Sequence, residues 1–127
     1  MLSGLYLITD NNQDGKLLTK VKAALTGGAK TVQYRAKDIL PDERREMAEN
    51  LKNLCSEYEA RLIINDLPEL AHDIDADGVH LGQEDMSIIQ ARQILGHQKL
   101  IGVSTHSVDE ALKAEAHGAD SVSYTHL

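Results

Sequence analysis

The sequence is poor in several residue types, and each shortage excludes a class of protein. Its 127 residues include one cysteine, two prolines, four tyrosines and neither tryptophan nor phenylalanine. The single cysteine, Cys55, rules out an internal disulfide and suits a reducing cytosol. Few aromatics, with 20 acidic against 13 basic residues, are not typical of nucleic-acid binders. No apolar run reaches the ~20 residues of a membrane span, and no signal-peptide pattern is recognised. We therefore expect a cytoplasmic domain that binds neither nucleic acid nor membrane.

Short apolar runs alternate with longer amphipathic stretches along the chain. The runs predict strands at 5–8, 31–35, 61–64, 78–81 and 100–104, with a sixth strand beginning near residue 119. The stretches between them predict helices from Leu17, from Pro41, over 67–72, from Ser87 and from Ser107, the last two with capping-box spacing. In the helix that Pro41 opens, residues 42–45 are all charged and are expected to lie in solvent. This alternation predicts a parallel sheet with right-handed crossovers.

Two architectures fit that alternation, an open doubly wound sheet and a (β/α)₈ TIM barrel. No glycine-rich nucleotide loop of the G-x-G-x-x-G or G-x-x-x-x-G-K-[ST] type is present, which weakens the open sheet. A complete barrel needs at least about 200 residues. We therefore expect an α/β TIM barrel truncated after about five and a half βα units.

Polar residues gather where the predicted strands end. Gln33, Arg35 and Lys37 follow one another at period two, so they share one side of an extended chain. The other strand ends carry Asn65 with Asp66, Gly82 to Asp85, and Ser104 with Thr105 and His106. In a parallel barrel all these groups converge on one rim, where the active sites of that fold lie.

The chemistry of this rim suits a phosphorylated ligand. Mg²⁺ is typically held by one or two carboxylates, here Asp66 and Asp85, together with phosphate oxygens. Arg35 and Lys37 would neutralise the same phosphates. Neutral hydrogen bonds for orientation would come from Asn65 and Ser104.

Each of these residues also has an ordinary structural use. Asp66 would cap the short helix that follows it, and Asp85 would sit in a turn. Arg35 and Lys37 would be a solvated pair. The remaining candidates are Ser104 and Thr105 as loop hydroxyls, His80 as a satisfied core histidine, and Cys55 as inert packing.

Five blocks of the chain resemble the thiamine phosphate synthase family. They are Gly4–Asp10, Val32–Asp38, Leu62–Asp66, Ala76–Asp85 and Ile101–Ser104. The resemblance implies a (β/α)₈ barrel and a transferase that joins hydroxymethylpyrimidine diphosphate to thiazole phosphate, releasing pyrophosphate. It also implies a dissociative reaction, in which pyrophosphate leaves before the thiazole nitrogen attacks.

The resemblance also implies roles for particular residues. Asp66 and Asp85 match the Mg²⁺ ligands. Gln33, Tyr34, Arg35, Ala36 and Lys37 match the segment that binds the pyrimidine diphosphate, with Asn65 and Ser104 as further contacts to that substrate.

The end of the chain departs from the family. The family continues after Gly118–Asp120 with a glycine-proline loop and a Thr-x-Thr-Lys stretch that binds the second substrate, and neither is present. Val122–Leu127 matches one reading frame of the transposase adapter CTGTCTCTTATACACATCT, and Ser121 fits the preceding codon. We therefore expect residues 1–120 to be the N-terminal part of a single barrel domain and 121–127 to be a non-native tail.

Rival functions remain on the same fold. One is a thiazole tautomerase, which needs no metal, and another is a non-catalytic ligand-binding barrel. Retention of both Asp66 and Asp85 favours the synthase. A barrel that is not closed is expected to be inactive, and the complete protein is a possible homo-oligomer.

Overall fold

Strands and helices alternate strictly in the computed structural model, which describes residues 5–9, 15–82, 87–105 and 108–124. In chain order they are β1 (Leu5–Ile8), α1 (Leu17–Thr26), β2 (Ala29–Tyr34), α2 (Pro41–Glu57), β3 (Arg61–Asn65), α3 (Pro68–Asp73), β4 (Gly78–Leu81), α4 (Ile88–Leu95), β5 (Leu100–Thr105), α5 (Val108–Ala116) and β6 (Ser121–Tyr124). The predicted alternation is confirmed, and the strands at 5–8 and 78–81 have the predicted bounds.

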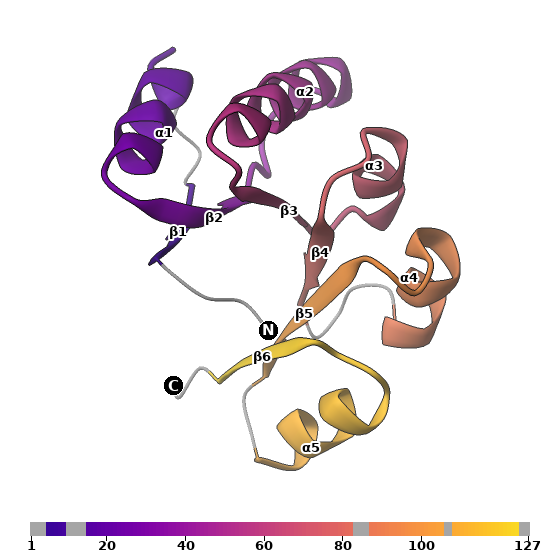
Figure 1. The fold of residues 1–127 in the computed structure, drawn as a ribbon. Helices are drawn as coiled ribbons and strands as arrows, with labels where there is room; N and C mark the ends of the chain where they lie inside the picture. Colours follow the sequence, from indigo (N-terminus) through magenta and orange to yellow (C-terminus); the bar gives the residue numbers. More distant parts are fainter. Residues whose placement is uncertain (1–4, 10–14, 83–86, 106–107, 125–127) are drawn as a thin grey trace.

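The strands form one parallel sheet that curls, with the helices on its convex side. The strand order is β1-β2-β3-β4-β5-β6, and each strand pairs in parallel with the next. Figure 1 shows the strands along an inner arc and the helices around its outside. A doubly wound sheet reverses its strand order at one point and carries helices on both faces. Over the described residues, the sequential order and the one-sided helices differ from that alternative.

The main core lies between the convex side of the sheet and the helices. Leu51 of α2 packs in one buried cluster with Leu62 and Ile64 of β3, and all three are at most 1% exposed. Because side chains alternate along a strand, Ile63 and Asn65 point to the concave side. The main core therefore uses one face of each strand, and the alternate residues lie on the concave face.

Two carboxylates and the close packing of β4 against β5 fix the edge of the sheet where the strands begin. Asp77 Oδ2 accepts a hydrogen bond from the N–H of Leu62 (2.8 Å), and Asp120 Oδ2 accepts one from the N–H of Ile101 (2.9 Å). A Cβ on Gly78 would lie 2.2 Å from the carbonyl oxygen of Leu100, so only glycine fits between β4 and β5 there. These contacts set the register of the strands that carry the opposite rim.

The helix ends follow local sequence signals where these can be compared. Ser87 and Gln90 form the predicted capping box at the start of α4. The matching prediction at Ser107 lies outside the described residues.

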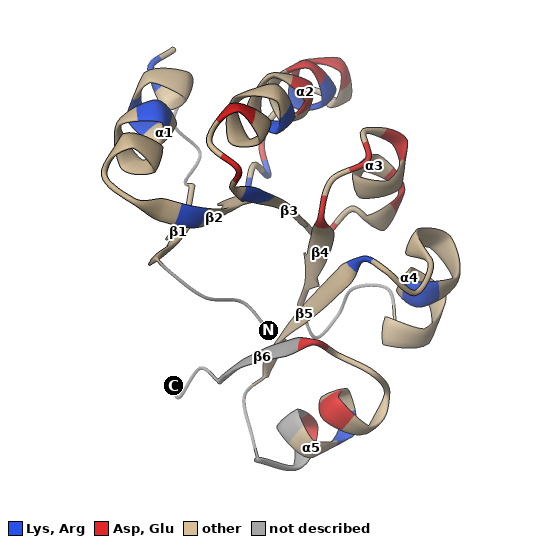
Figure 2. Cartoon of the chain, in the orientation of Figure 1, with Lys and Arg blue, Asp and Glu red and all other residues tan. Residues whose placement is uncertain are grey.

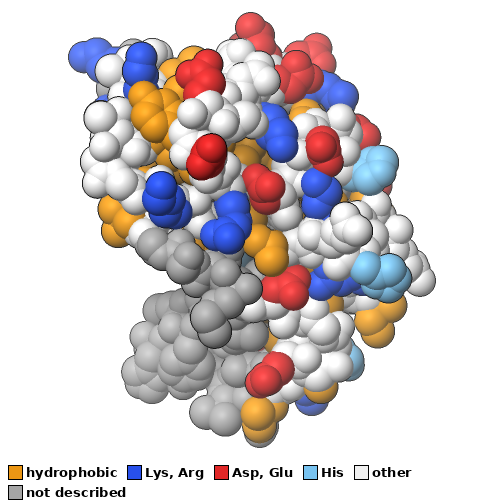
Figure 3. All heavy atoms as spheres, in the orientation of Figure 1, with side chains coloured by type: hydrophobic (Ala, Val, Ile, Leu, Met, Phe, Trp, Pro, Cys, Tyr) orange, Lys and Arg blue, Asp and Glu red, His pale blue; other side chains and the backbone are white. Residues whose placement is uncertain are grey.

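Charged residues lie mainly on the helices, as Figure 2 shows. In the space-filling view of Figure 3, acidic and basic side chains are interspersed over the described part of that face. Within the described ranges, no helix is long and apolar enough to cross a membrane.

Candidate functional site

The segment after β2 brings two cations to the rim where the strands end. Arg35 follows β2 directly, and its N–H donates to Thr9 Oγ1 (3.0 Å). The N–H of Thr9 in turn donates to the carbonyl of Gln33 (3.0 Å). The Arg35 side chain is exposed. Thr9 therefore fixes the main chain of Arg35 and leaves its guanidinium accessible to a ligand.

A chain of hydrogen bonds crosses the concave face below that segment. Gln33 is 3% exposed; its Nε2 donates to the Tyr6 hydroxyl (3.0 Å), and its Oε1 accepts from Asn65 Nδ2 (2.9 Å). Burial raises the pKa of Tyr6, and the hydrogen bond from Gln33 partly opposes that rise. The network fixes which way the Gln33 and Asn65 amides face on the concave side.

Asp66 directly follows β3 and forms an ion pair with Lys37 of the segment after β2. Its φ of 69° is in the left-handed region, which Asp tolerates better than most residues, and its N–H donates to the carbonyl of His80 (2.8 Å). Asp66 Oδ2 lies 3.5 Å from Lys37 Nζ. The N-cap of α3 is Leu67, and no side chain caps that helix, so the alternative role of Asp66 as a cap is wrong. The left-handed turn instead carries the carboxylate to the rim.

His80 and Ser104 form a second polar pair on β4 and β5. His80 Nε2 lies 2.7 Å from Ser104 Oγ, and both side chains are half-buried. Ser104 and Thr105 belong to β5, so the alternative in which they are loop hydroxyls is wrong. Ser104 thus lies at the strand end, as the rim interpretation requires.

Two of the candidate binding residues face away from the concave side or are covered. Tyr34 is 2% exposed and packs in the core on the convex side, opposite its neighbour Gln33. Burial raises the pKa of Tyr34, and the Arg44 guanidinium partly offsets that rise. Ala36 is half-buried against the same core. The structure therefore places the Tyr34 side chain opposite Gln33 within β2, and Arg35 and Lys37 in the segment that follows the strand.

Sequence reasoning missed Arg44, which it placed in solvent. Arg44 is half-buried, and its guanidinium donates to the carbonyls of Ala36, Lys37 and Ile39 at 3.0–3.2 Å. No sequence signal marks this role, because the partners of Arg44 are main-chain carbonyls, which every residue carries.

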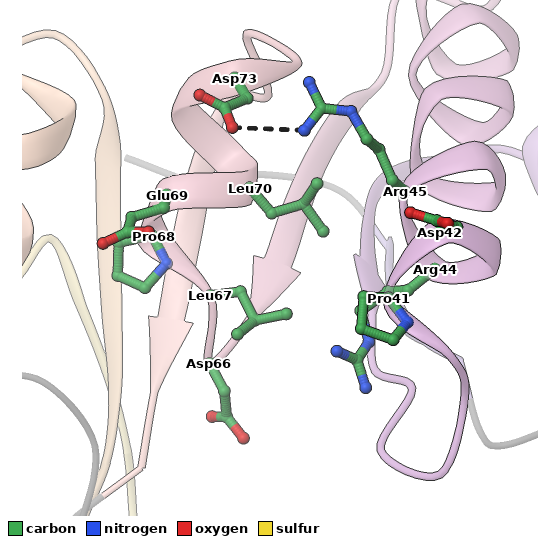
Figure 4. A pocket seen from close by; sticks show the side chains of 10 residues that line it. All are labelled: Pro41, Asp42, Arg44, Arg45, Asp66, Leu67, Pro68, Glu69, Leu70 and Asp73. Carbon is green, nitrogen blue, oxygen red and sulfur yellow. Dashed lines mark hydrogen bonds and ion pairs between the residues drawn. The ribbon is translucent and has the colours of Figure 1, made fainter.

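A groove of about 500 Å³ lies beside the rim, between α2 and α3. Figure 4 shows Arg45 pointing toward Asp73 at one end of it, where Arg45 Nη1 lies 3.3 Å from Asp73 Oδ2. Arg44 points toward the opposite end, on the side of Asp66 (Figure 4). The groove therefore adjoins the polar rim at Asp66.

Among the described residues, the rim provides one of the two carboxylates that were predicted to hold Mg²⁺. Asp66 offers one carboxylate, whose side chain is 25% exposed, and carboxylate oxygen is the ligand type that Mg²⁺ prefers. No group of three metal-binding side chains occurs in the described part of the chain. Asp85, the second predicted carboxylate, lies outside the described residues, as does His106. Chemically, the rim can bind an anion through Arg35 and Lys37 beside one carboxylate.

Comparisons with known proteins agree with one another. A family model described as thiamine monophosphate synthase matches residues 5–127. The chain is 50% identical over 118 residues to a thiamine-phosphate synthase of Synechocystis sp., covering 93% of this chain and 34% of that protein. It is 45% identical over 125 residues to a thiamine-phosphate synthase of Nitrosospira multiformis, covering 97% and 53%. A solved thiamine phosphate pyrophosphorylase from Pyrococcus furiosus superposes with a TM-score of 0.87 at 40% identity, covering 94% of this chain and 58% of that one.

The matches cover most of this chain and only part of each relative. The chain spans about a third to a half of the length of the first curated relatives it matches.

Proposed function

The chain belongs to the thiamine monophosphate synthase family, and we propose that it forms the first part of a transferase barrel. In that proposal the whole protein is a (β/α)₈ barrel. It condenses hydroxymethylpyrimidine diphosphate with thiazole phosphate, giving thiamine phosphate and pyrophosphate in thiamine biosynthesis.

The observation that supports this function best is the meeting of β2 and β3 at one rim. Lys37 Nζ lies 3.5 Å from Asp66 Oδ2 although the two residues come from different βα units. A cation and a carboxylate at this distance suit a diphosphate bound together with a divalent cation. The overall charge of −7 would repel such an anion, so a local positive site is needed.

The proposed reaction depends on stabilising the leaving group and positioning the substrate. The bond between the pyrimidine methylene carbon and the diphosphate oxygen breaks, and the oxygen keeps the electron pair. Arg35 and Lys37 stabilise the charge that grows on that diphosphate. The thiazole nitrogen then forms the new bond to the methylene carbon.

The concave face would hold the pyrimidine during this step. Gln33 and Asn65 present amides whose orientation is fixed by the network with Tyr6, and Ser104 presents a hydroxyl beside His80. The Tyr34 side chain lies in the core, so we propose that Tyr34 and Ala36 contribute through their main chain.

Asp66, with Asp85, would hold Mg²⁺. The ion supplies positive charge to the diphosphate oxygens when it is bound.

The proposal extends to domain limits, location and assembly. Residues 1–120 would be native barrel and 121–127 a foreign tail. The pairing of β6 with β5 through residues 121–124 is compatible with either origin, because parallel pairing uses the main chain and β-prone residues suffice. The buried free thiol of Cys55 supports a cytoplasmic location.

Small phosphorylated substrates, rather than nucleic acid, are the proposed partners, and the complete enzyme is a candidate homo-oligomer.

The test is product formation by the whole protein that contains this chain, with both substrates and Mg²⁺. Asp66→Asn keeps the size of the side chain and removes its charge, so we expect kcat/KM to fall at least about a hundredfold. Asp73→Asn is the matched control, because Asp73 is an exposed carboxylate in an ion pair with Arg45. We expect that variant to match the wild type, since exposed pairs contribute little to stability.

The 127-residue chain by itself is a further arm of the experiment, and it should form no thiamine phosphate. Wild-type protein without synthase activity would contradict the proposed function. Full activity of Asp66→Asn in this assay would contradict the role of Asp66 in holding the metal.

A further inference from the structure

We propose that Arg44 is a positioning residue, whose guanidinium sets the shape of the β2–α2 loop that presents Arg35 and Lys37 to the diphosphate. This inference rests on the proposed function. It concerns a side chain that lies on a helix and is not one of the candidate ligand-binding groups.

The contacts of Arg44 all go to main-chain oxygens of that loop. Its Nε donates to the carbonyl of Ala36 (3.0 Å), and its Nη2 donates to the carbonyls of Lys37 (3.0 Å) and Ile39 (3.2 Å). Residues 35–40 belong to neither a strand nor a helix, so no helical or strand geometry fixes the shape of this segment. Three hydrogen bonds from Arg44 to its carbonyls restrict that shape instead.

The geometry needs an arginine in particular. A guanidinium is planar and offers five N–H donors in a fixed fork, so it can serve three carbonyls that face it from one side. A lysine ammonium carries the same charge on a single atom with a different reach. Arg44→Lys therefore keeps the positive charge and removes the planar set of N–H donors.

The loop is held on its other side by β1. Thr9 Oγ1 accepts from the N–H of Arg35, so Arg35 is fixed from the sheet and the next residues are fixed from α2. Fixing the Lys37 carbonyl restricts where its side chain starts, and Lys37 Nζ lies 3.5 Å from Asp66 Oδ2. A displacement of about 1 Å in such a group can change a rate by about a hundredfold. Control of loop shape is thus control of the anion site.

Arg45 provides a matched control on the same helix. It is the next residue and also an arginine, but its guanidinium pairs with Glu49 and Asp73 and points the other way along the groove (Figure 4). Arg45→Met removes a charge of the same sign at nearly the same place without touching the loop.

The experiment compares Arg44→Met, Arg44→Lys and Arg45→Met in the whole protein, with folding checked by circular dichroism. We expect both Arg44 variants to raise KM for the pyrimidine diphosphate about tenfold and to leave KM for the thiazole phosphate unchanged. A merely structural role would lower the active fraction, and with it kcat, without changing either KM. Arg45→Met should match the wild type. Wild-type values of both KM in Arg44→Met, or full rescue by Arg44→Lys, would overturn the inference.

Amide hydrogen exchange keeps this test separate from the proposed function. Residues 36–40 should exchange about tenfold faster in both Arg44 variants than in the wild type or Arg45→Met. If the wild type makes no thiamine phosphate, the proposed function fails, and the exchange rates still decide whether Arg44 shapes the loop. Unchanged exchange in the Arg44 variants would overturn that role whatever the activity.

Discussion

The surroundings of Cys55 make its thiol unreactive. Cys55 is 1% exposed in α2, and burial, with the nearby Asp77 carboxylate, raises its pKa from 9.0 to about 11. The thiol is therefore protonated at neutral pH. Because folding raises this pKa, the thiol's contribution to the free energy of unfolding is complete below pH 9 and is lost as the pH rises toward 11.

We predict that a disulfide reagent at pH 8 labels native Cys55 at least about a hundredfold more slowly than the denatured chain. Peptide mapping by mass spectrometry assigns the label to Cys55, the one cysteine of these 127 residues. Rapid labelling of the native protein would mean that the thiol is accessible and that α2 does not pack as described.

For single residues, the strand period predicted which side of the sheet a side chain faces, but the sequence did not predict which atoms a side chain contacts. Period two places Gln33 on the concave side of β2, where its amide bonds Tyr6 and Asn65. The same rule places Tyr34 on the other side, which the family motif alone does not reveal. Arg44 was missed because its partners are carbonyl oxygens, and main-chain acceptors leave no mark in a sequence. The identity of a residue thus tells which functional group is present, but not which atoms that group contacts.

Among the elements, the start of β3 depends on a carboxylate from the next unit. Asp77 Oδ2 accepts from the N–H of Leu62 at 2.8 Å, which supplies a partner where the ladder begins. We predict that Asp77→Ala lowers the free energy of unfolding by about 1–3 kcal/mol, because it leaves that donor unpaired. Denaturant titration of the whole protein measures the change.

Asp75→Asn is the control for that experiment, two residues away, because asparagine tolerates the left-handed φ of 57° that Asp75 adopts. Asp75 is exposed and pairs with Lys99, whose ammonium lies 2.6 Å from Asp75 Oδ1 and holds the pKa of Asp75 below its usual value. A lowered carboxyl pKa stabilises the fold at neutral pH, and that contribution is lost as the pH falls through the pKa in the folded state. For so exposed a pair we expect little change at neutral pH. Equal losses in both variants would contradict the special role of Asp77.

Element boundaries were predictable where a local signal exists. Ser87 and Gln90 have capping-box spacing, and α4 begins there as predicted. Asp66 is a residue type that often caps helices. It instead occupies a left-handed turn, because its N–H donates to the carbonyl of His80 on the neighbouring strand. That pairing depends on β4, which is distant in sequence, so no local rule predicts it.

On the scale of the molecule, the alternation of elements predicts a parallel sheet but leaves two strand orders open, and the structure shows the sequential one. Each strand pairs with the next one in sequence, as right-handed crossovers favour. The curl places the helices outside and the polar strand ends on one rim (Figure 1). Closure of the sheet is a separate matter, since β1 and β6 stand at opposite ends of the strand order. Among the described residues β1 and β6 are the edge strands, and edge strands favour pairing with further strands, such as those of the proposed barrel.

The most direct test of the central claim, that this chain is the first part of a synthase barrel, is the DNA sequence of its source locus. The locus should be read past the codon for Asp120 without a transposase-based library. We predict that the frame continues into a glycine-proline loop, a Thr-x-Thr-Lys stretch and further βα units. A genuine stop codon directly after Leu127 would contradict the claim.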